Sequence, residues 1–270
     1  MSPTRLKRDI FAMNLQRFID AKQDELRQLR LCMPEPLELP RPDFRAALMT
    51  PPPAGEPLRV IAEFKRSSPS AGIINDRLSP EDVAQQYAAA GATCMSVLTE
   101  GRYFTGHLGD LHAAAPAGLP LLRKDFIFNE LQVRQSFSTP ASALLLIVAL
   151  TPDVSRLRAL RELAETQGLH AVVEVFTERE LELARESGAR IIQVNARNLE
   201  TFRTDREEGL KLAALRQEGE CWIAASAMSE RPHLEQARQA GYQAALIGTA
   251  LMSPLTNASP FGNLHRLLHA

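Results

Sequence analysis

The stretch Ser142–Phe176, "SALLLIVALTPDVSRLRALRELAETQGLHAVVEVF", predicts a strand, a helix and a second strand in succession. Both apolar runs are rich in Val, Ile and Leu at consecutive positions, which is typical of strands that are buried on both faces. The segment between them opens with Thr151 followed by an acidic residue and closes on Gly168, as helix start and stop signals do. Strands of this kind joined by a helix predict a parallel sheet covered by helices.

The same alternation runs through the chain from Leu58 onward. Eight apolar runs occur: "RVIAEF", "TCMSVLT", "LPLLRKD", "SALLLIVAL", "HAVVEVF", "RIIQVN", "CWIAAS" and "AALIGTA". Helix-like segments lie between most of them, and the weakest is the second, "EGRYFTGHLGDLHAAAPAG". Eight such units in about 210 residues predict an α/β fold of the (β/α)₈ TIM-barrel type. A doubly wound open sheet is less favoured, because no Gly-x-Gly-x-x-Gly turn follows the first strand.

An N-terminal extension, residues 1–57, precedes the predicted barrel of residues 58–270. Apolar side chains recur there at helical spacing and predict an amphipathic helix: Leu6, Ile10, Phe11, Leu15, Phe18, Ile19 and Leu26. The proline-rich "MPEPLELPRPDFRAALMTPPPAGEP" that follows is a connector with room for one short helix at Phe44–Met49. We expect the extension to lie on the barrel, so that the chain forms one structural domain.

Bulk composition excludes several classes of protein. The 270 residues carry a net charge of −1 and 45% hydrophobic residues, so nothing favours nucleic acid or an anionic membrane as a partner. No apolar run approaches the length of a membrane span. The three cysteines are far apart and lack metal-ligand spacing, which is typical of small apolar fillers in a reducing compartment. We expect a cytoplasmic protein without a metal.

Polar residues stand where the predicted strands end. Alternation along "VIAEFKRSSPS" places Glu63 and Lys65 on one side of the first strand and Arg66 on the other, towards the helices. The other strand ends carry Lys124, Asp125, Glu174, Asn195, Arg197, Ser226, Gly248 and Thr249. The carboxyl ends of barrel strands form the active sites of such folds. A Lys or Glu on the inner side of a strand is costly unless it is paired or used, so Lys65, Lys124 and Glu174 are candidates. For Asp125, an anchor for its loop is the simpler interpretation.

The last two strands indicate a phosphate. In "ALIGTALM", the backbone N–H of Gly248 is open to an anion and Thr249 adds a hydroxyl, while "AASAMS" offers similar donors one strand earlier. Loops after strands seven and eight are the usual phosphate site of these barrels. Arg197 can add a bidentate contact. The sequence therefore predicts a small phosphorylated substrate.

The residues around these strand ends resemble one family, the indole-3-glycerol-phosphate synthases, which are (β/α)₈ enzymes. The resemblance covers nearly the whole chain in order, including the extra N-terminal helix. It is carried by "IAEFKRSSPSAG", "SVLTEGRYFTGHLGDL", "LPLLRKDFIFNELQV", "VVEVFTERELELA", "NARNLETF" and "ALIGTALM". The resemblance implies a cytoplasmic carboxy-lyase of tryptophan biosynthesis without cofactor or metal. Its reaction closes a ring on 1-(2-carboxyphenylamino)-1-deoxyribulose 5-phosphate with loss of carbon dioxide and water.

Residue roles follow from the same resemblance. Lys124 matches the general acid and Glu174 the other acid–base group, while Glu63 and Lys65 set the charge around both. Lys65 either holds the substrate carboxylate or assists dehydration, and the sequence leaves both open. The remaining matches are Asn195 and Ser226 for hydroxyl groups, Arg197, Gly248 and Thr249 for phosphate, Ser68 in the first loop, and Phe104 and Phe126 as walls for the aromatic ring. The resemblance favours a monomer and makes other tryptophan-pathway enzymes candidate partners.

Three departures from the family pattern leave alternatives open. The usual Glu-Ser-Gly-Ile is Ala225-Ser226-Ala227-Met228, so a carboxylate is missing and a glycine has gained a methyl group. The usual Gly-Ala-Asp is Pro140-Ala141-Ser142, and Ala196 stands between Asn195 and Arg197. The alternatives are a slow synthase, a paralog that binds an anthranilate-like phosphate without turnover, and a synthase with a shifted substrate. Retention of the charged residues favours catalysis.

Overall fold

Eight parallel strands close into a barrel in the computed structural model, which describes residues 15–69, 71–197, 204–253 and 259–269. Each strand pairs with the next unit of the chain, and the last pairs with the first. The strands are β1 (Arg59–Phe64), β4 (Cys94–Leu98), β5 (Leu121–Ile127), β6 (Ala143–Ile147), β7 (His170–Val175), β8 (Ile191–Asn195), β9 (Cys221–Ala225) and β10 (Ala244–Ile247). The predicted (β/α)₈ class is confirmed, and the open sheet is excluded.

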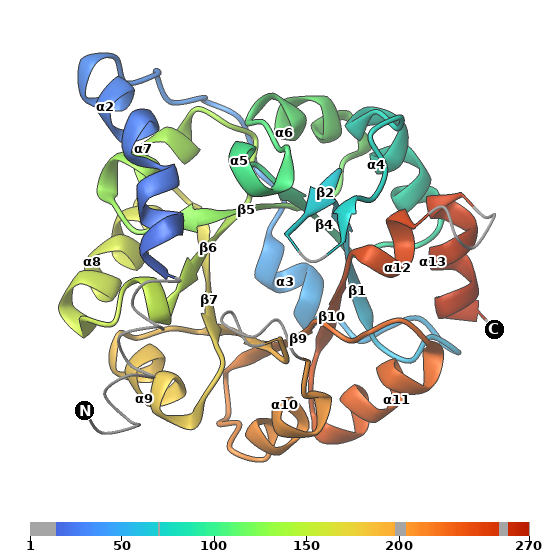
Figure 1. The fold of residues 1–270 in the computed structure, drawn as a ribbon. Helices are drawn as coiled ribbons and strands as arrows, with labels where there is room; N and C mark the ends of the chain where they lie inside the picture. The colour runs from blue at the N-terminus through green and yellow to red at the C-terminus, as the bar shows by residue number, and fades with distance from the viewer. Residues whose placement is uncertain (1–14, 70, 198–203, 254–258, 270) are drawn as a thin grey trace.

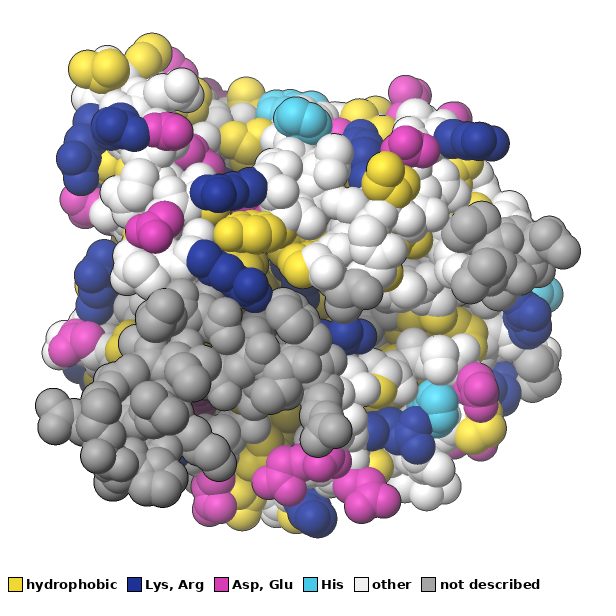
Figure 2. Space-filling model, viewed as in Figure 1, with side chains coloured by type: hydrophobic (Ala, Val, Ile, Leu, Met, Phe, Trp, Pro, Cys, Tyr) yellow, Lys and Arg dark blue, Asp and Glu magenta, His cyan; other side chains and the backbone are white. Residues whose placement is uncertain are grey.

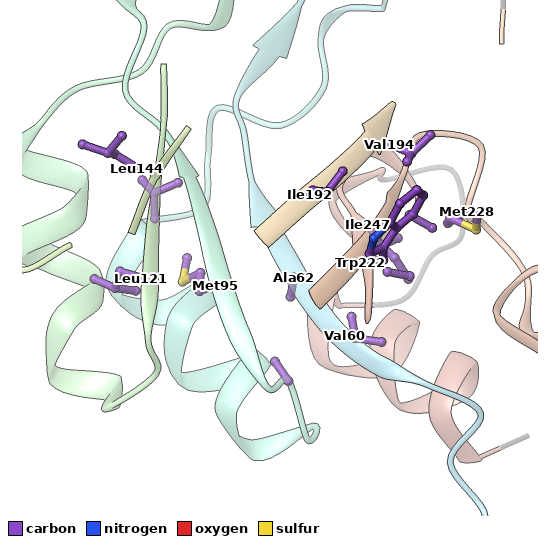
Figure 3. Packing of buried hydrophobic residues seen from close by; sticks show 14 of the residues in the cluster. Val60, Ala62, Met95, Leu121, Leu144, Ile192, Val194, Trp222, Met228 and Ile247 are labelled. Atoms are coloured by element: carbon purple, nitrogen blue, oxygen red, sulfur yellow. The ribbon is translucent and has the colours of Figure 1, made fainter. Parts of the chain in front are cut away.

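Alternation along each strand divides the core into two clusters. Ile61, Leu122 and Val172 belong to a cluster inside the barrel, whereas their neighbours face the helices. Figure 3 shows part of the outer cluster, with side chains such as Val60, Met95, Leu144 and Trp222 contributed by different strands of the barrel. Because both faces of each strand are buried, the sequences of the strands are continuous apolar runs.

Helices surround the barrel in the order that the sequence predicts (Figure 1). They are α4 (Pro80–Ala89), α7 (Glu130–Phe137), α8 (Val154–Glu165), α9 (Glu178–Glu186), α10 (Arg206–Ala213), α11 (Arg231–Ala240), α12 (Thr249–Met252) and α13 (Pro260–His269). Asp153, two residues after the expected Thr151, accepts a hydrogen bond from the first turn of α8. The weak second unit holds two short helices, α5 (Gly101–Phe104) and α6 (Gly109–Ala114), and then a 3₁₀ turn.

The N-terminal extension is helical over residues 15–21 and again in α2 (Gln23–Leu31), with a turn at Lys22. The predicted helix therefore exists but is interrupted, and Leu6, Ile10 and Phe11 lie outside the described residues. The division at residues 57 and 58 stays a prediction.

The short helix α3 (Phe44–Met49) has the predicted bounds. Its buried Phe44 and Leu48 join the inner cluster with Cys94 and Cys221, the first residues of β4 and β9. In Figure 1, α3 lies within the ring of strands. It therefore closes the amino-terminal end of the barrel and leaves the carboxyl ends of the strands for a site.

A two-stranded hairpin, β2 (Ser67–Ser68) and β3 (Gly72–Ile73), follows β1 at that end. Within the described part of the chain, no helix is both long and apolar enough to cross a membrane.

Candidate active site

A cavity of about 810 Å³ opens at the carboxyl ends of the strands. All twelve residues predicted for the site line it: Glu63, Lys65, Ser68, Phe104, Lys124, Phe126, Glu174, Asn195, Arg197, Ser226, Gly248 and Thr249. In the space-filling view, hydrophobic and basic side chains lie next to one another near the centre of the molecule (Figure 2). The structure thus brings the predicted residues into one cavity, while their chemical roles stay predictions.

Glu63 lies at the centre of the charged part of the cavity. Its Oε1 is 2.9 Å from Lys65 Nζ and its Oε2 is 3.8 Å from Lys124 Nζ. Burial alone would raise the pKa of Glu63, but the two ammonium groups outweigh it and hold the pKa below its ordinary value. An acid and an amine on the same side of β1 therefore form a buried ion pair rather than a solvated strand end.

Glu174 faces Lys124 from the other side. Its Oε2 is 3.8 Å from Lys124 Nζ and accepts a hydrogen bond from Gln193 Nε2 on the next strand. Both carboxylates are almost fully buried, at 3% and 2% exposed for Glu63 and Glu174. One ammonium group thus stands between two buried carboxylates, an arrangement suited to proton transfer.

Polar groups on β8 and β9 meet beside this cluster. Asn195 Oδ1 accepts hydrogen bonds from Ser226 Oγ at 2.8 Å and from the backbone N–H of Arg197 at 3.0 Å. After the next strand, β10, Gly248 lies against the ion pair: a Cβ built there would be 2.3 Å from Glu63 Oε1 and 2.9 Å from Lys65 Nζ. Only glycine allows this close approach.

Aromatic side chains form another wall. Phe126 stacks on Phe18 with ring centroids 4.1 Å apart, and Phe104 lies 6.1 Å from Phe126. Phe18 belongs to the N-terminal helical segment and was not among the predicted site residues. The apolar stripe of this segment is visible in the sequence. Which surface the stripe covers depends on the contact between Phe18 and Phe126, which are more than 100 residues apart in the chain.

Asp125 anchors this N-terminal segment to the barrel. Its carboxylate is 2.6 Å from Lys22 Nζ and 3.1 Å from Arg123 Nη2, and it accepts the Thr99 hydroxyl at 2.7 Å. Burial would raise the pKa of Asp125, but the charges of Lys22 and Arg123 lower it to about 2. The structural interpretation of Asp125 is supported, although it holds the N-terminal segment rather than only its own loop. Arg66 likewise pairs in the helix layer, with Asp110.

The residues of the seventh unit that differ from the family pattern, Ala225 and Ala227, line the cavity. Ala225 is 2% exposed and pairs in register with Asn195. Ser226 and Ala227 have φ values of 69° and 57°, the left-handed region that favours glycine. The missing carboxylate and the added methyl group therefore both lie at the site. Across the described ranges, no cluster of three or more His, Cys, Asp or Glu side chains could hold a metal ion.

Known proteins resemble this chain in sequence and in fold. A family model described as indole-3-glycerol phosphate synthase matches residues 15–259. The indole-3-glycerol phosphate synthase of Chloroherpeton thalassium is 42% identical over 81% of this chain and 84% of its own length. That of Lacticaseibacillus paracasei is 40% identical over 78% and 80%. The structure of 3-hexulose-6-phosphate synthase from Salmonella typhimurium superposes with a TM-score of 0.61 over 78% of this chain and 96% of that chain. At 13% identity it shows the fold alone.

Proposed function

The chain belongs to the indole-3-glycerol phosphate synthase family, and on that premise we propose that Lys124, Glu63 and Glu174 carry its acid–base chemistry. The activity is that of a carboxy-lyase of tryptophan biosynthesis. Its substrate is 1-(2-carboxyphenylamino)-1-deoxyribulose 5-phosphate. The observation that carries the proposal is the position of Lys124 Nζ, 3.8 Å from both Glu63 Oε2 and Glu174 Oε2.

Ring closure needs an acid at the substrate ketone. Lys124 donates a proton to the carbonyl oxygen while the aromatic carbon that bears the carboxylate attacks the carbonyl carbon. The carboxylate then leaves as carbon dioxide, and its bonding electrons restore the aromatic ring. Glu63 and Glu174 lie on either side of this ammonium group, each with its Oε2 3.8 Å from Lys124 Nζ, and hold it in position in the cavity.

Dehydration needs an acid and a base together. The new hydroxyl group leaves as water after it accepts a proton from a lysine, and Glu174 takes the proton from the neighbouring ring carbon. Lys65, held by Glu63 at 2.9 Å, is the second available acid. A proton-transfer group of this kind contributes about 10²–10⁴-fold to the rate.

Substrate binding uses the rest of the cavity. Gly248, Thr249 and Arg197 hold the phosphate, while Asn195 and Ser226 orient hydroxyl groups. Phe104 and Phe126 hold the aromatic ring, and Ser68 contacts the ligand from the first loop. The crowding of Gly248 against Glu63 and Lys65 supports this division, because it brings the backbone at the end of β10 beside the charged groups.

A paralog that binds the ligand without turnover is the second candidate, and Ala225 is the observation that favours it. The buried ion pairs favour the synthase, because a binding protein gains nothing from two desolvated carboxylates. Mixing the purified protein with the substrate separates the two. The synthase gives catalytic growth of indole fluorescence, whereas a binding protein shows saturable binding of the substrate without product.

The oligomeric state, the cellular compartment and the partner proteins of the enzyme stay predictions. We expect a monomer, and the mass of the protein in solution tests this. The three cysteines are free, which supports the cytoplasm as its compartment. Association with other tryptophan-pathway enzymes is tested by co-purification.

A further inference from the structure

Gln193 lies directly beside Glu174 but outside the cavity wall. The two residues are register partners on β8 and β7, and both point into the barrel. The Gln193 side chain is completely buried and does not line the cavity. Its link to the cavity is Glu174, whose Oε2 accepts a hydrogen bond from Gln193 Nε2.

The carbonyl oxygen of the Gln193 amide has no hydrogen-bond donor among the described residues. This atom, Gln193 Oε1, is buried. A buried acceptor without a donor is unfavourable, and native proteins contain few of them. The Oε1 atom is therefore available to accept a hydrogen bond when a donor appears beside it.

We propose that Gln193 is a positioning residue that stabilises Glu174 in both of its protonation states. The inference rests on the proposed function, in which Glu174 takes a proton from the substrate. While Glu174 is a carboxylate, Gln193 Nε2–H donates to it. When the proton arrives from the substrate carbon, the carboxyl group becomes a donor, and a half-turn of the amide brings Oε1 round to accept its O–H. An amide offers both halves, whereas an apolar side chain offers neither.

Other charges act on Glu174 from three elements. Lys124 faces it from β5, Glu63 lies on β1 beyond Lys124, and Glu180 lies in the first turn of α9. Burial raises the pKa of Glu180, the backbone N–H of Phe176 partly offsets this, and the charge of Glu174 raises the pKa further. All of these groups remain when Gln193 is replaced, so a change in the pH profile reports the amide alone.

The test is the pH dependence of kcat and KM in Gln193→Met, which keeps the size and removes both hydrogen-bonding atoms. We expect kcat to fall about 10- to 100-fold, the loss that corresponds to one hydrogen bond to a charged group, with KM changed less than about threefold. The hydrogen bond from Nε2–H to the charged carboxylate is stronger than the bond between the neutral carboxyl group and Oε1, so loss of the amide costs the carboxylate more and moves the acidic limb of the profile to higher pH. Gln193→Glu removes the donor and adds a second acid, and it should move the limb at least as far.

Ile223→Met is the matched control, because Ile223 is the register partner of Gln193 on β9 and does not line the cavity. Parental kinetics in Ile223→Met together with the shifted limb in both Gln193 variants support the inference. A parental pH profile in Gln193→Met, or an equal loss in the control, overturns it. The variant Glu174→Gln distinguishes failure of the proposed function from failure of the Gln193 inference. If that variant keeps the parental kcat, the proposed role of Glu174 fails. If it loses activity while Gln193→Met does not, only the inference fails.

Discussion

Ala227 holds a backbone conformation that suits glycine, with φ at 57°. A non-glycine residue there costs roughly 1–2 kcal/mol, while glycine costs about 0.5–1 kcal/mol more entropy on folding. We therefore expect Ala227→Gly to leave the free energy of unfolding unchanged or raise it by up to about 1.5 kcal/mol. Urea denaturation followed by the fluorescence of Trp222, the single tryptophan, measures it.

Ala214→Gly is the matched control for this measurement. Ala214 is exposed at the end of α10 with φ at −63°, so the same change there should destabilise by about 0.5–1 kcal/mol. An equal loss at both positions would show that Ala227 carries no strain.

Ala225 leaves the seventh strand end without a carboxylate. The loss of one preorganised polar group from a closed site costs about 10²–10³ in rate. We expect a slow parent enzyme, and we expect Ala225→Glu combined with Ala227→Gly to raise kcat in steady-state assays. A fast parent that is slowed by the double change would mean that the site is adapted to the alanine.

Single residues show what the sequence predicts and what it leaves out. Glu63, Lys124 and Glu174 could be predicted because parity along a strand decides which way a side chain points. The same parity applies to Gln193, two positions before Asn195, and could have identified it. The contact between Phe18 and Phe126 depends on how a distant helix docks, which no local pattern encodes.

The N-terminal segment is the element whose attachment depends on pH. The pKa of Asp125, about 2, lies below its ordinary value near 3.8, so its stabilisation is fully present above about pH 4 and is lost as the pH falls through about 2. Between pH 5 and pH 3, we expect the parent to lose on the order of 1 kcal/mol more unfolding free energy than Asp125→Asn. Urea denaturation at the two pH values measures this. Equal losses in parent and variant would argue against the buried ion pairs.

Elements with strong end signals were predicted best. The bounds of α3 were predicted because Asp43 caps it and prolines flank it. The second unit was not, because α5 and α6 are too short and glycine-rich for a helical period. The turn at Lys22 lies in a good helical pattern, and the sequence gives no sign that Lys22 forms a buried ion pair with Asp125 there.

At the scale of the whole molecule, the residues that close the amino-terminal end of the barrel and the residues of the candidate site lie at opposite ends of the barrel. Leu48 of α3 is 1% exposed at the closed end, so Leu48→Ala should lower the free energy of unfolding by about 2–5 kcal/mol. The site lies at the opposite end, so kcat of the folded variant should change less than about twofold. Met49→Ala, 40% exposed on the same helix, should change stability by no more than about 0.5 kcal/mol. A large fall in kcat for Leu48→Ala would show that the two ends are coupled.

The central claim is that Lys124, between Glu63 and Glu174, is the acid that closes the ring. Its most direct test is kcat of Lys124→Ala, measured by indole fluorescence, with the exposed Lys211→Ala as control and circular dichroism to verify folding. We predict a fall of about 10²–10⁴-fold for Lys124→Ala and parental activity for the control. A folded Lys124→Ala protein that keeps most of the parental kcat would contradict the account, because the acid would then lie elsewhere.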